Sequence, residues 1–397
     1  MLKDKTVILG VTGSIAAYKI AGLASMLVKK HCDVHVIMTE NATQFITPVT
    51  FETLTGNKCL VDTFDRNFQF HVAHVSLAKK ADVMLVAPAS ANIIGKLAGG
   101  IADDMLTTTA LACKCPILVS PAMNTNMYTN PIVQDNLDKL RRFGFEIIEP
   151  DSGFLACRDE GAGKMPSETV LYDHILRVIG REKDMKGLKV VVTAGPTQER
   201  LDPVRYLTNH SSGKMGYMIA RAAMLRGAEV VLVSGITALD PVPFVKMVNI
   251  ESAQDMYEAV SSEFEDTDIV IKAAAVADYR PATVSDDKIK KKDGDMSIPL
   301  ERTIDIIASL GKIKRDDQFI CGFSMETKDM LENSKAKLVK KNLDMIVANN
   351  LKVEGAGFGV DTNKVTIIKP DEIRELPLMT KEEVAFALLD EILKARK

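Results

Sequence analysis

Polar side chains follow two apolar segments in the first half of the chain, at positions where ligands commonly bind. Gly13 and Ser14 follow TVILGV, and Ser90 follows DVMLVAPA. Backbone N–H groups at a strand-to-helix turn, together with a serine hydroxyl that also caps the helix, suit an anion such as a phosphate. A simple turn is the plainer explanation for Gly13 alone, because the segment lacks the G-x-G-x-x-G spacing of dinucleotide-binding folds.

Three other side chains of the first half have the chemistry to act on a substrate. His74 lies three residues after His71, but no carboxylate or cysteine motif completes a metal site, and a lone helical histidine is usually structural. Asn124, between prolines in PAMNTNMYTNP, can hold a carboxylate or cap its own loop. Cys157 lies among glycines and basic residues that favour a thiolate, which is consistent with an active-site lid or with an incidental surface cysteine.

The second half carries a polar run, an acidic turn and several lysines. NHSSGKMG, from Asn209, leads into a helix and offers an anion cradle, but a methionine stands where a P-loop needs Ser or Thr. Asp278, in AAAVADYRP, is placed for magnesium, for a ligand hydroxyl or simply for a turn. The run DDKIKKKD contains Lys288 and is either a solvated surface or a loop that closes over a triphosphate. Lys337 and Lys341 share a helical face and either reach the same phosphates or stay in solvent.

Short apolar segments alternate with helical patterns in both halves, which predicts doubly wound, mostly parallel α/β sheets. In the first half we expect strands at 5–11, 33–39, 82–87, 116–119 and 145–149, helices from Ser14 and near 168–179, and a polar, glycine-rich loop at 151–166. In the second half we expect strands near 188–193, 229–234, 268–275, 318–323, 343–348 and 364–368, helices at about 214–226, 252–264, 328–341 and 380–395, and a lysine-rich functional loop at 280–297. A charged stretch between glycines separates the halves, so we predict domains at 1–182 and 183–397.

The composition limits the classes of function. A chain of 397 residues is too long for one ordinary core, and its net charge of −3 argues against general binding of nucleic acid or of a membrane surface. Aromatic residues make up only 5%, and Trp is absent, which removes stacking platforms for single-stranded nucleic acid. No apolar run is long enough for a bilayer, and MLKDKTVILG enters a strand at once, so we expect a cytoplasmic protein. The six cysteines lack paired CxxC spacing, which argues against a zinc or redox centre and favours buried thiols in a reducing compartment.

The order of several motifs resembles a known enzyme family. The first half resembles the flavin-dependent cysteine decarboxylases in TGSIAAYK, AHVSLAKKADVMLVAPASANIIGKLAGGIADD, PAMNTNMY and ACRDEGAGKM. The second half resembles the ligase part of the bifunctional phosphopantothenoylcysteine decarboxylase/phosphopantothenate–cysteine ligases of coenzyme A biosynthesis, in TAGPTQERLDPVRYLTNHSSGKMG, AAAVADYRP, KIKK, GFSMET and KKNLDMIVANN. The chain departs from the usual family pattern at Arg158, at Lys164 and in GFSMET, where GFAAET is more usual.

For the first half, the resemblance implies a flavodoxin-like domain that decarboxylates 4′-phosphopantothenoylcysteine to 4′-phosphopantetheine with FMN. The thiol is oxidised to a thioaldehyde, which supplies the electron sink for decarboxylation, and the resulting enethiol is then reduced. The resemblance assigns His74 as the base, Asn124 as the group that orients the carboxylate, and Cys157 as the final proton donor. The residues that would hold FMN are Gly13, Ser14, Thr39 and Ser90.

For the second half, the resemblance implies a second Rossmann-like three-layer domain. CTP activates the carboxylate of 4′-phosphopantothenate as an acyl-cytidylate, releasing pyrophosphate, and the amine of L-cysteine then attacks. Asn209 would bind the acyl-cytidylate, Lys288 would act in the activation step, and magnesium would accompany the triphosphate. The residues that would hold CTP are Asp278, Phe323, Lys337 and Lys341. The resemblance also implies a homo-oligomer, with trimeric flavin domains and dimeric ligase domains giving a dodecamer.

Two other classes of function compete with this interpretation. Decarboxylase-like folds also occur in regulatory subunits that inhibit phosphatases, but His74, Asn124 and Cys157 are all present and the ligase half is complete. The paired strand–turn–helix openings also suggest a two-domain nicotinamide oxidoreductase, which the missing G-x-G-x-x-G disfavours.

Overall fold

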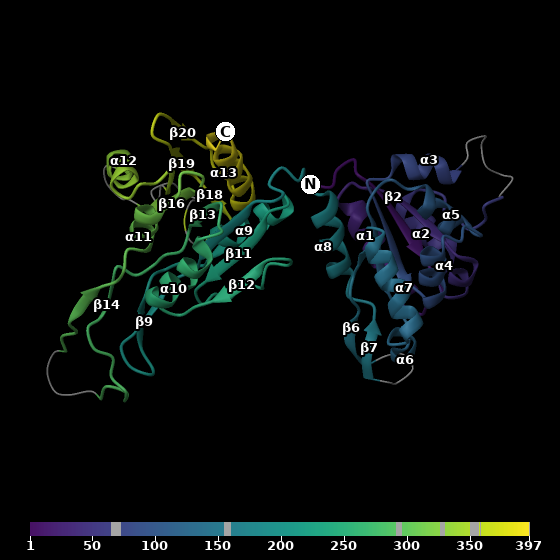
Figure 1. The fold of residues 1–397 in the computed structure, drawn as a ribbon, viewed down its shortest axis with the longest axis horizontal. Helices are drawn as coiled ribbons and strands as arrows, with labels where there is room; N and C mark the ends of the chain where they lie inside the picture. The colour runs from purple at the N-terminus through teal and green to yellow at the C-terminus, as the bar shows by residue number, and fades with distance from the viewer. Residues whose placement is uncertain are drawn as a thin grey trace. The chain divides into compact units, whose positions relative to one another are not determined.

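The computed structural model describes residues 1–64, 73–154, 160–290, 296–325, 330–349, 357 and 359–396. The chain divides into two compact units, Met1–Arg181 and Glu182–Lys397, and each is an α/β domain with its own sheet. Figure 1 shows helices on both faces of each sheet. Each unit is described below by itself.

The first unit is built on five parallel strands in the order β2-β1-β3-β4-β5. The strands are β1 (Thr6–Val11), β2 (Asp33–Met38), β3 (Val83–Ala89), β4 (Ile117–Pro121) and β5 (Glu146–Ile147). Every residue of β1, β3 and β4 is buried, because helices cover both faces of the sheet. The predicted doubly wound parallel sheet is therefore confirmed, with the strand order of flavodoxin-like folds.

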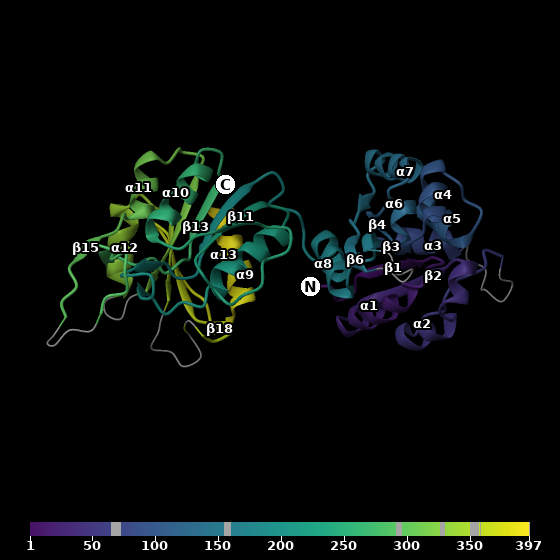
Figure 2. The same ribbon diagram turned by 90° about the horizontal axis from the view of Figure 1, so that it is seen from below.

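Two groups of helices enclose this sheet. The helices are α1 (Ala17–Lys29), α2 (Pro48–Thr55), α3 (Ala73–Lys80), α4 (Ala91–Gly99), α5 (Met105–Ala112), α6 (Thr125–Tyr128), α7 (Pro131–Arg142) and α8 (Glu168–Ile179), with a 3-10 turn, η1 (Glu40–Gln44). α1 packs against α2 and α8, and α4 packs against α5 and α7, so the two groups lie on opposite faces (Figure 2). The predicted apolar stripe of α1, from Ile20 to Leu27, is buried. The helix begins later than expected, however, with Ala16 rather than Ser14 at its N-cap.

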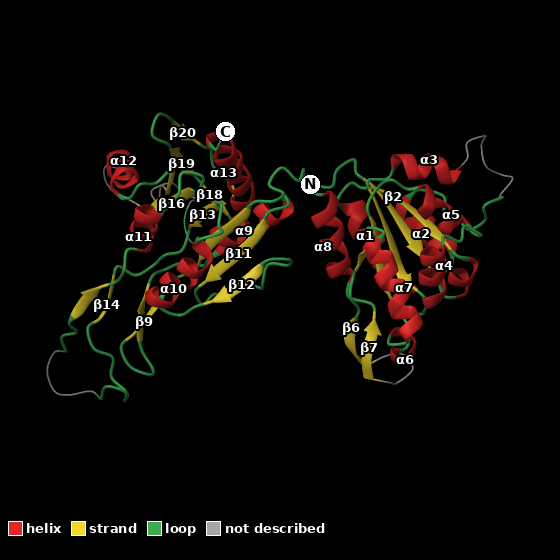
Figure 3. Ribbon diagram, in the orientation of Figure 1, coloured by secondary structure: helices red, strands yellow, loops and turns green. Residues whose placement is uncertain are grey.

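The segment 151–166, predicted to be a glycine-rich loop, is instead an antiparallel hairpin of β6 (Asp151–Phe154) and β7 (Glu160–Lys164) (Figure 3). Its glycines allow a close approach to the segment before α6. A Cβ on Gly163 would lie 2.3 Å from the carbonyl oxygen of Met123, and one on Gly161 would lie 2.7 Å from Oγ1 of Thr125. Both glycines also have positive φ, which favours glycine. The prediction was wrong because contacts distant in sequence, and not local mobility, require these glycines.

The second unit is built on an eight-stranded, mostly parallel sheet in the order β12-β11-β8-β13-β16-β17-β19-β20. Its strands are β8 (Lys189–Ala194), β11 (Glu229–Ser234), β12 (Lys246–Asn249), β13 (Ile269–Lys272), β16 (Phe319–Met325), β17 (Met345–Asn349), β19 (Val365–Ile368) and β20 (Ile373–Glu375). In the described part of this sheet β19 pairs antiparallel with both β17 and β20, and the other strand pairs are parallel. Its helices are α9 (Lys214–Leu225), α10 (Ala253–Phe264), α11 (Ile306–Ile313), α12 (Met330–Lys340) and α13 (Lys381–Ala395). The predicted parallel α/β alternation is confirmed, although α11, β12 and β20 were not expected.

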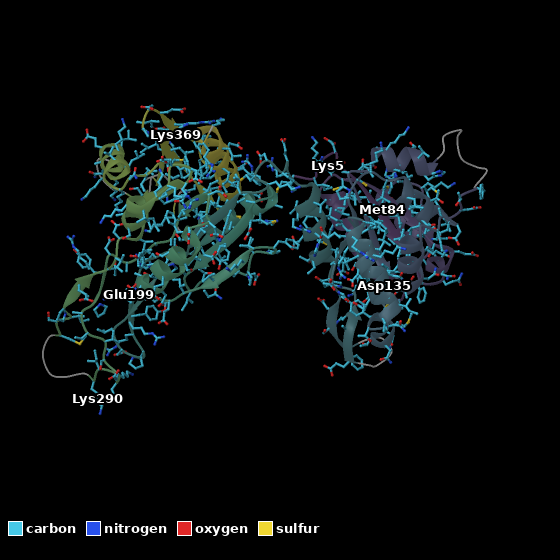
Figure 4. The ribbon with its side chains drawn as sticks, viewed as in Figure 1. Lys5, Met84, Asp135, Glu199, Lys290 and Lys369 are labelled. Atoms are coloured by element: carbon cyan, nitrogen blue, oxygen red, sulfur yellow. The ribbon has the colours of Figure 1, made fainter. Side chains whose placement is uncertain are left out.

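The described part of the second unit also has three short antiparallel strand pairs outside its main sheet. They are β9 (Gln198–Arg200) with β10 (Tyr206–Thr208), β14 (Tyr279–Pro281) with β15 (Leu300–Arg302), and β18 (Thr362–Asn363) with β21 (Met379–Thr380). β14 and β15 form the base of the predicted loop 280–297. Ile289 of this loop is held by the segment before β10. Its backbone N–H donates to Asp202 at 3.1 Å, and its carbonyl accepts from Arg205 at 2.9 Å. The segment between β14 and β15 is here called the extension, and Figure 4 shows Lys290 at its tip.

A buried carboxylate ties α13 to the edge of the second sheet. Glu391 is 2% exposed and forms ion pairs with Lys369 and Lys394 at 2.9 Å and with Arg374 at 2.5 Å. Burial alone would raise the pKa of Glu391, but hydrogen bonds from Lys369 and Lys394 outweigh it and lower the pKa to about 2. Figure 4 labels Lys369 beside α13.

Two expectations from composition bear on the thiols and on membranes. Cys32, Cys59 and Cys321 are buried, as predicted, and burial raises the pKa of Cys32 to about 11 and that of Cys59 to about 12. Cys113 and Cys115 are only partly buried. Among the described helices, we find none that combines the length and apolar character needed to cross a bilayer.

Candidate active sites

The first unit has a cavity of about 430 Å³ at the carboxyl ends of its central strands, here called the edge cavity. Gly13, Thr39 and Ser90, three of the residues predicted to bind a cofactor, line it. β1 and β3 are parallel neighbours, so their ends open on the same edge, as expected. The small hydroxyls of the nearby α5 serve packing and capping: Thr107 and Thr109 are fully buried, and Thr107 forms a capping box with Asp104.

Thr12 holds the two strand ends together. Its hydroxyl donates to the carbonyl of Pro88 at 2.6 Å and accepts from the backbone N–H of Ser90 at 3.0 Å. The side chain is 1% exposed, so these bonds satisfy a buried hydroxyl. Sequence reasoning missed Thr12, although a hydroxyl directly after an apolar strand and before a glycine turn was an available signal.

The edge cavity has the features of a phosphate and polyol site. A Cβ on Gly13 would lie 2.8 Å from Cβ of Asn41, so only glycine allows η1 to approach this closely. The Thr39 hydroxyl is buried and has no hydrogen-bond partner in the described part of the chain. An unsatisfied buried hydroxyl is costly, which points to a ligand that completes it. Ser90 caps α4 by accepting from the N–H of Ile93 at 3.4 Å, and the N-terminus of α4 faces the same cavity.

A second cavity of about 530 Å³, here called the flap cavity, lies between the start of α1, α6 and the β6–β7 hairpin. Ser14 and Asn124 line it. The Ser14 hydroxyl does not cap α1 and instead accepts from the N–H of Ala16 at 3.3 Å. Asn124 caps α6 through its Oδ1, which accepts from the N–H of Asn126 at 2.8 Å. The capping role of Asn124 is therefore confirmed, and the residue also lies in the wall of the flap cavity.

Of the other two predicted catalytic residues of this half, only His74 lies in the described part of the chain, and it does not share a cavity with Asn124 there. Cys157 and His71 lie outside the described residues. His74 is half-buried on α3, and among the described residues it lines neither the edge cavity nor the flap cavity. Figure 1 shows α3 and α6 at opposite ends of the unit.

The second unit has a cleft of about 470 Å³ at the carboxyl ends of β8, β13 and β16, here called the main cleft. Asn209, Asp278 and Phe323, all predicted from the sequence, line it together with Lys214 and Lys381. The amide of Asn209 donates to the carbonyl of Ala275 at 3.2 Å. Sequence reasoning missed Lys381, because the first residue of a C-terminal helix gives no local sign that it lies in a cleft.

The start of α9 forms one wall of the main cleft. Gly213 is the N-cap with a φ of 76°, and Gly216 lies so close to β8 that a Cβ would be 2.6 Å from that of Ala194. Thr193, 1% exposed at the end of β8, accepts from the backbone N–H of Ala274 at 3.1 Å. These contacts fix backbone N–H groups of the polar run NHSSGKMG at the cleft, which suits an anionic ligand.

A smaller cavity of about 310 Å³, here called the side cavity, adjoins the main cleft, and Asp278 lines both. Lys341 lines the side cavity and pairs with Asp305 at 2.8 Å. Lys337 lines neither cavity within the described residues but is half-buried on the neighbouring α12. Lys288 is exposed near the tip of the extension and, in the same described part, also lines neither cavity.

Family models match both halves of the chain. The model described as DNA/pantothenate metabolism flavoprotein C-terminal domain matches residues 185–395, and the Flavoprotein model matches residues 1–180. The coenzyme A biosynthesis bifunctional protein CoaBC of Bacillus subtilis (strain 168) is 47% identical over 396 residues, covering 99% of this chain and 97% of that protein. The chain belongs to the CoaBC family.

Other CoaBC proteins agree over the same length. The protein of Escherichia coli (strain K12) is 42% identical over 394 residues, covering 98% of this chain and 97% of that protein. Among solved structures, the C-terminal domain of a coenzyme A biosynthesis bifunctional protein CoaBC is 48% identical, with a TM-score of 0.45, and covers 52% of this chain and 95% of that chain. The two full-length relatives match both halves of the chain.

Proposed function

We propose that the first unit is an FMN-dependent decarboxylase that converts 4′-phosphopantothenoylcysteine to 4′-phosphopantetheine. The observation that carries this proposal is the edge cavity, where the buried Thr39 hydroxyl lacks a described partner beside the close approach of Gly13 to Asn41. Hydroxyls and the N-terminus of α4 suit the phosphate and ribityl chain of FMN. When bound, FMN supplies the two-electron oxidation and reduction that make loss of the carboxylate feasible.

The residues around the flap cavity would act on the substrate. The side chain of Asn124 lies in the cavity wall, where its amide nitrogen can donate to the substrate carboxylate and orient it. The β6–β7 hairpin carries Cys157 between its two strands, and this thiol is proposed to deliver the final proton. Phe154, the last residue of β6, and Lys164, the last residue of β7, line the cavity and would exclude water from it.

We propose that the base His74 comes from a neighbouring copy of the chain. Within one chain α3 and α6 lie at opposite ends of the unit, whereas a trimer of flavin domains with FMN near the interface brings two copies to one site. Mixed oligomers test this arrangement. Trimers assembled from inactive His74→Gln and inactive Asn124→Ala chains should regain decarboxylase activity, because some sites receive both native residues. Mixed trimers as inactive as their parents would contradict the shared site.

Purified protein tests the cofactor and the role of the thiol. The protein should carry visible flavin absorption, and a colourless preparation that also takes up no added FMN would count against the proposal. Cys157→Ser should stop turnover after decarboxylation and accumulate the oxidised enethiol product, detected by mass. Unchanged formation of the reduced product would refute the assignment of Cys157.

We propose that the second unit is the CTP-dependent phosphopantothenate–cysteine ligase. Asn209 and the backbone N–H groups at the start of α9 would bind the acyl-cytidylate in the main cleft, with Phe323 against the nucleotide. Lys341, which lines the adjoining side cavity, would neutralise the phosphates together with Lys337. Lys288, in the extension, would act in the activation step once the extension closes over the cleft. Magnesium would arrive with the triphosphate, because this ion is usually held by one or two carboxylates and by substrate phosphates.

Product analysis tests the ligase assignment. The protein is supplied with 4′-phosphopantothenate, L-cysteine, CTP and magnesium, and the products are identified by mass. Formation of CMP, pyrophosphate and 4′-phosphopantothenoylcysteine is expected. Lys288→Gln should slow formation of the acyl-cytidylate and spare the decarboxylase, whereas loss of both activities would mean that Lys288 is structural. Equal turnover with ATP in place of CTP would contradict the choice of nucleotide.

A further inference from the structure

Lys272, the last residue of β13, points to a ligand contact that the motifs do not assign. It lines the side cavity together with Asp278, Arg302, Asp305 and Lys341. In the described part of the chain, no hydrogen bond or ion pair holds the Lys272 amine, whereas Lys341 is held by Asp305 at 2.8 Å. Lys272 is half-buried, and removing a cation from water without a counter-ion is costly, so such a group in a cavity wall indicates an anion that binds there.

The surroundings of Lys272 lower the pKa of its amine. Burial, reinforced by the positive charge of Lys341, lowers the pKa of Lys272 to about 8. The charged or titratable groups that face it are Lys337 and Lys341 at α12, Asp305 at the start of α11, and Asp278 after β13, with Tyr279 of β14 and Arg302 of β15 in the same wall. The neighbouring strands present only uncharged partners, Thr193 of β8 and Gly322 of β16. With this pKa the amine is mostly protonated at pH 7 and about half protonated at pH 8, and a bound anion favours the protonated form.

The side cavity is suited to phosphate groups. Its wall carries three basic side chains, those of Lys272, Arg302 and Lys341, against the carboxylates of Asp278 and Asp305. Its volume of about 310 Å³ accommodates a few phosphate groups but leaves little room for a nucleoside, for which the main cleft is available across Asp278. A ligand that lies in the main cleft can thus extend its phosphates into the side cavity.

We infer that Lys272 is a phosphate-binding residue of the ligase site. Its amine donates from the wall of the side cavity to a phosphate group of a bound substrate. This inference rests on the proposed ligase function. Two substrates offer such a group, the triphosphate of CTP and the single phosphate of 4′-phosphopantothenate. A triphosphate gives more charge for the three basic side chains to neutralise, and both ligands are separate arms of the test.

Calorimetric titration of the full-length, FMN-loaded protein tests the inference. CTP with magnesium and 4′-phosphopantothenate are titrated separately into the native protein, Lys272→Met and Lys340→Met. Lys340 is the matched control, because it is an exposed lysine at the end of α12 that lines neither cavity in the described structure. We expect Lys272→Met to weaken one of the two ligands by about tenfold to a hundredfold, the range for a hydrogen bond to a charged group. Lys340→Met should bind both ligands within about twofold of the native protein.

Proton uptake gives a readout that a merely structural role of Lys272 would not produce. Repeating the titration at pH 8 in buffers of different ionisation enthalpy should show uptake of up to about half a proton per site for the native protein. The same uptake should disappear in Lys272→Met. Lys272→Gln, with retained FMN and an unchanged thermal transition, replaces Lys272→Met if that variant does not fold.

The outcomes separate this inference from the ligase assignment. If the native protein binds CTP, and Lys272→Met binds both ligands as tightly as the native protein with the same proton uptake, the role assigned to Lys272 is wrong and the ligase function stands. If the native protein binds neither ligand and forms no product from the substrates, the proposed function fails first. The ligand whose affinity falls in Lys272→Met identifies the phosphate that the side cavity binds.

Discussion

Replacement of Gly13 by alanine tests whether the edge cavity holds FMN. The added Cβ would lie 2.8 Å from Cβ of Asn41, well inside ordinary contact, so η1 must move away from the start of α1. Because Asn41 is exposed, η1 can shift without unfolding the core, but Thr39 immediately precedes it and would shift as well. Overpacking of this kind costs about 1–3 kcal/mol. If that cost falls on the bound state, FMN binding weakens by about fivefold to 150-fold.

Fluorescence titration of flavin-free protein with FMN measures this effect. Gly95→Ala is the matched control, because its new Cβ would lie 3.9 Å from the nearest atom, in the middle of α4. That variant should bind FMN normally and gain up to about 1 kcal/mol of stability, since alanine favours helix. Gly13→Ala should also retain the ligase activity of the other unit. If Gly13→Ala binds FMN as tightly as Gly95→Ala, the cofactor lies elsewhere and the assignment of the edge cavity is wrong.

Three further variants probe the contacts that hold the two sites. Thr12→Val should weaken FMN binding by about five- to tenfold in the same titration, because the N–H of Ser90 loses its acceptor. Gly216→Ala should impair the ligase and spare the decarboxylase in paired activity assays, since its Cβ would meet Ala194 at 2.6 Å and push α9 from the sheet at a cost of about 1–3 kcal/mol. Glu391→Gln should lower the unfolding free energy of the second unit by about 3 kcal/mol at pH 7 in urea titrations. Because the folded pKa of Glu391 is lowered to about 2, its contribution is present above pH 4.5 and lost as pH falls towards 2, so native and variant should converge in acid.

The sequence predicted the central strands well because their burial is a local signal. β1, β3 and β11 are continuous apolar runs, and such runs need cover on both faces wherever they lie in the fold. The edge strand β20 was missed because all three of its residues are exposed and show no alternation. β13 ends at Lys272, earlier than the predicted 275, since the N–H of Ala274 bonds to the Thr193 hydroxyl and not to a neighbouring strand.

The site residues also divide into those that local motifs predict and those that depend on the folded or assembled structure. Gly13, Thr39 and Ser90 share one cavity because motifs at the ends of parallel strands necessarily meet at one edge. In the proposed shared site, the relation between His74 and Asn124 depends on how copies assemble, which motif spacing within one chain does not encode. The isolation of Lys272 was equally invisible, because it depends on which carboxylate Lys341 pairs with after folding. Local patterns therefore locate the crevices, and the tertiary arrangement decides which charges within them remain uncompensated.

In both units a threonine hydroxyl fixes a loop at the cavity, but the side chains that line the two cavities differ. The hydroxyl of Thr12 binds the N–H of Ser90 at 3.0 Å, and that of Thr193 binds the N–H of Ala274 at 3.1 Å. In each case a threonine at the end of the first strand fixes the loop after its parallel neighbour, β3 or β13. The edge cavity presents hydroxyls, and Lys96 in its wall is already paired with Asp103 at 2.7 Å and with Asp104 at 3.2 Å. In the described structure the side cavity instead retains Lys272 and Arg302 beyond the ion pair of Lys341 with Asp305, so the same backbone arrangement presents hydroxyls in the first unit and basic groups in the second, as the two proposed ligands require.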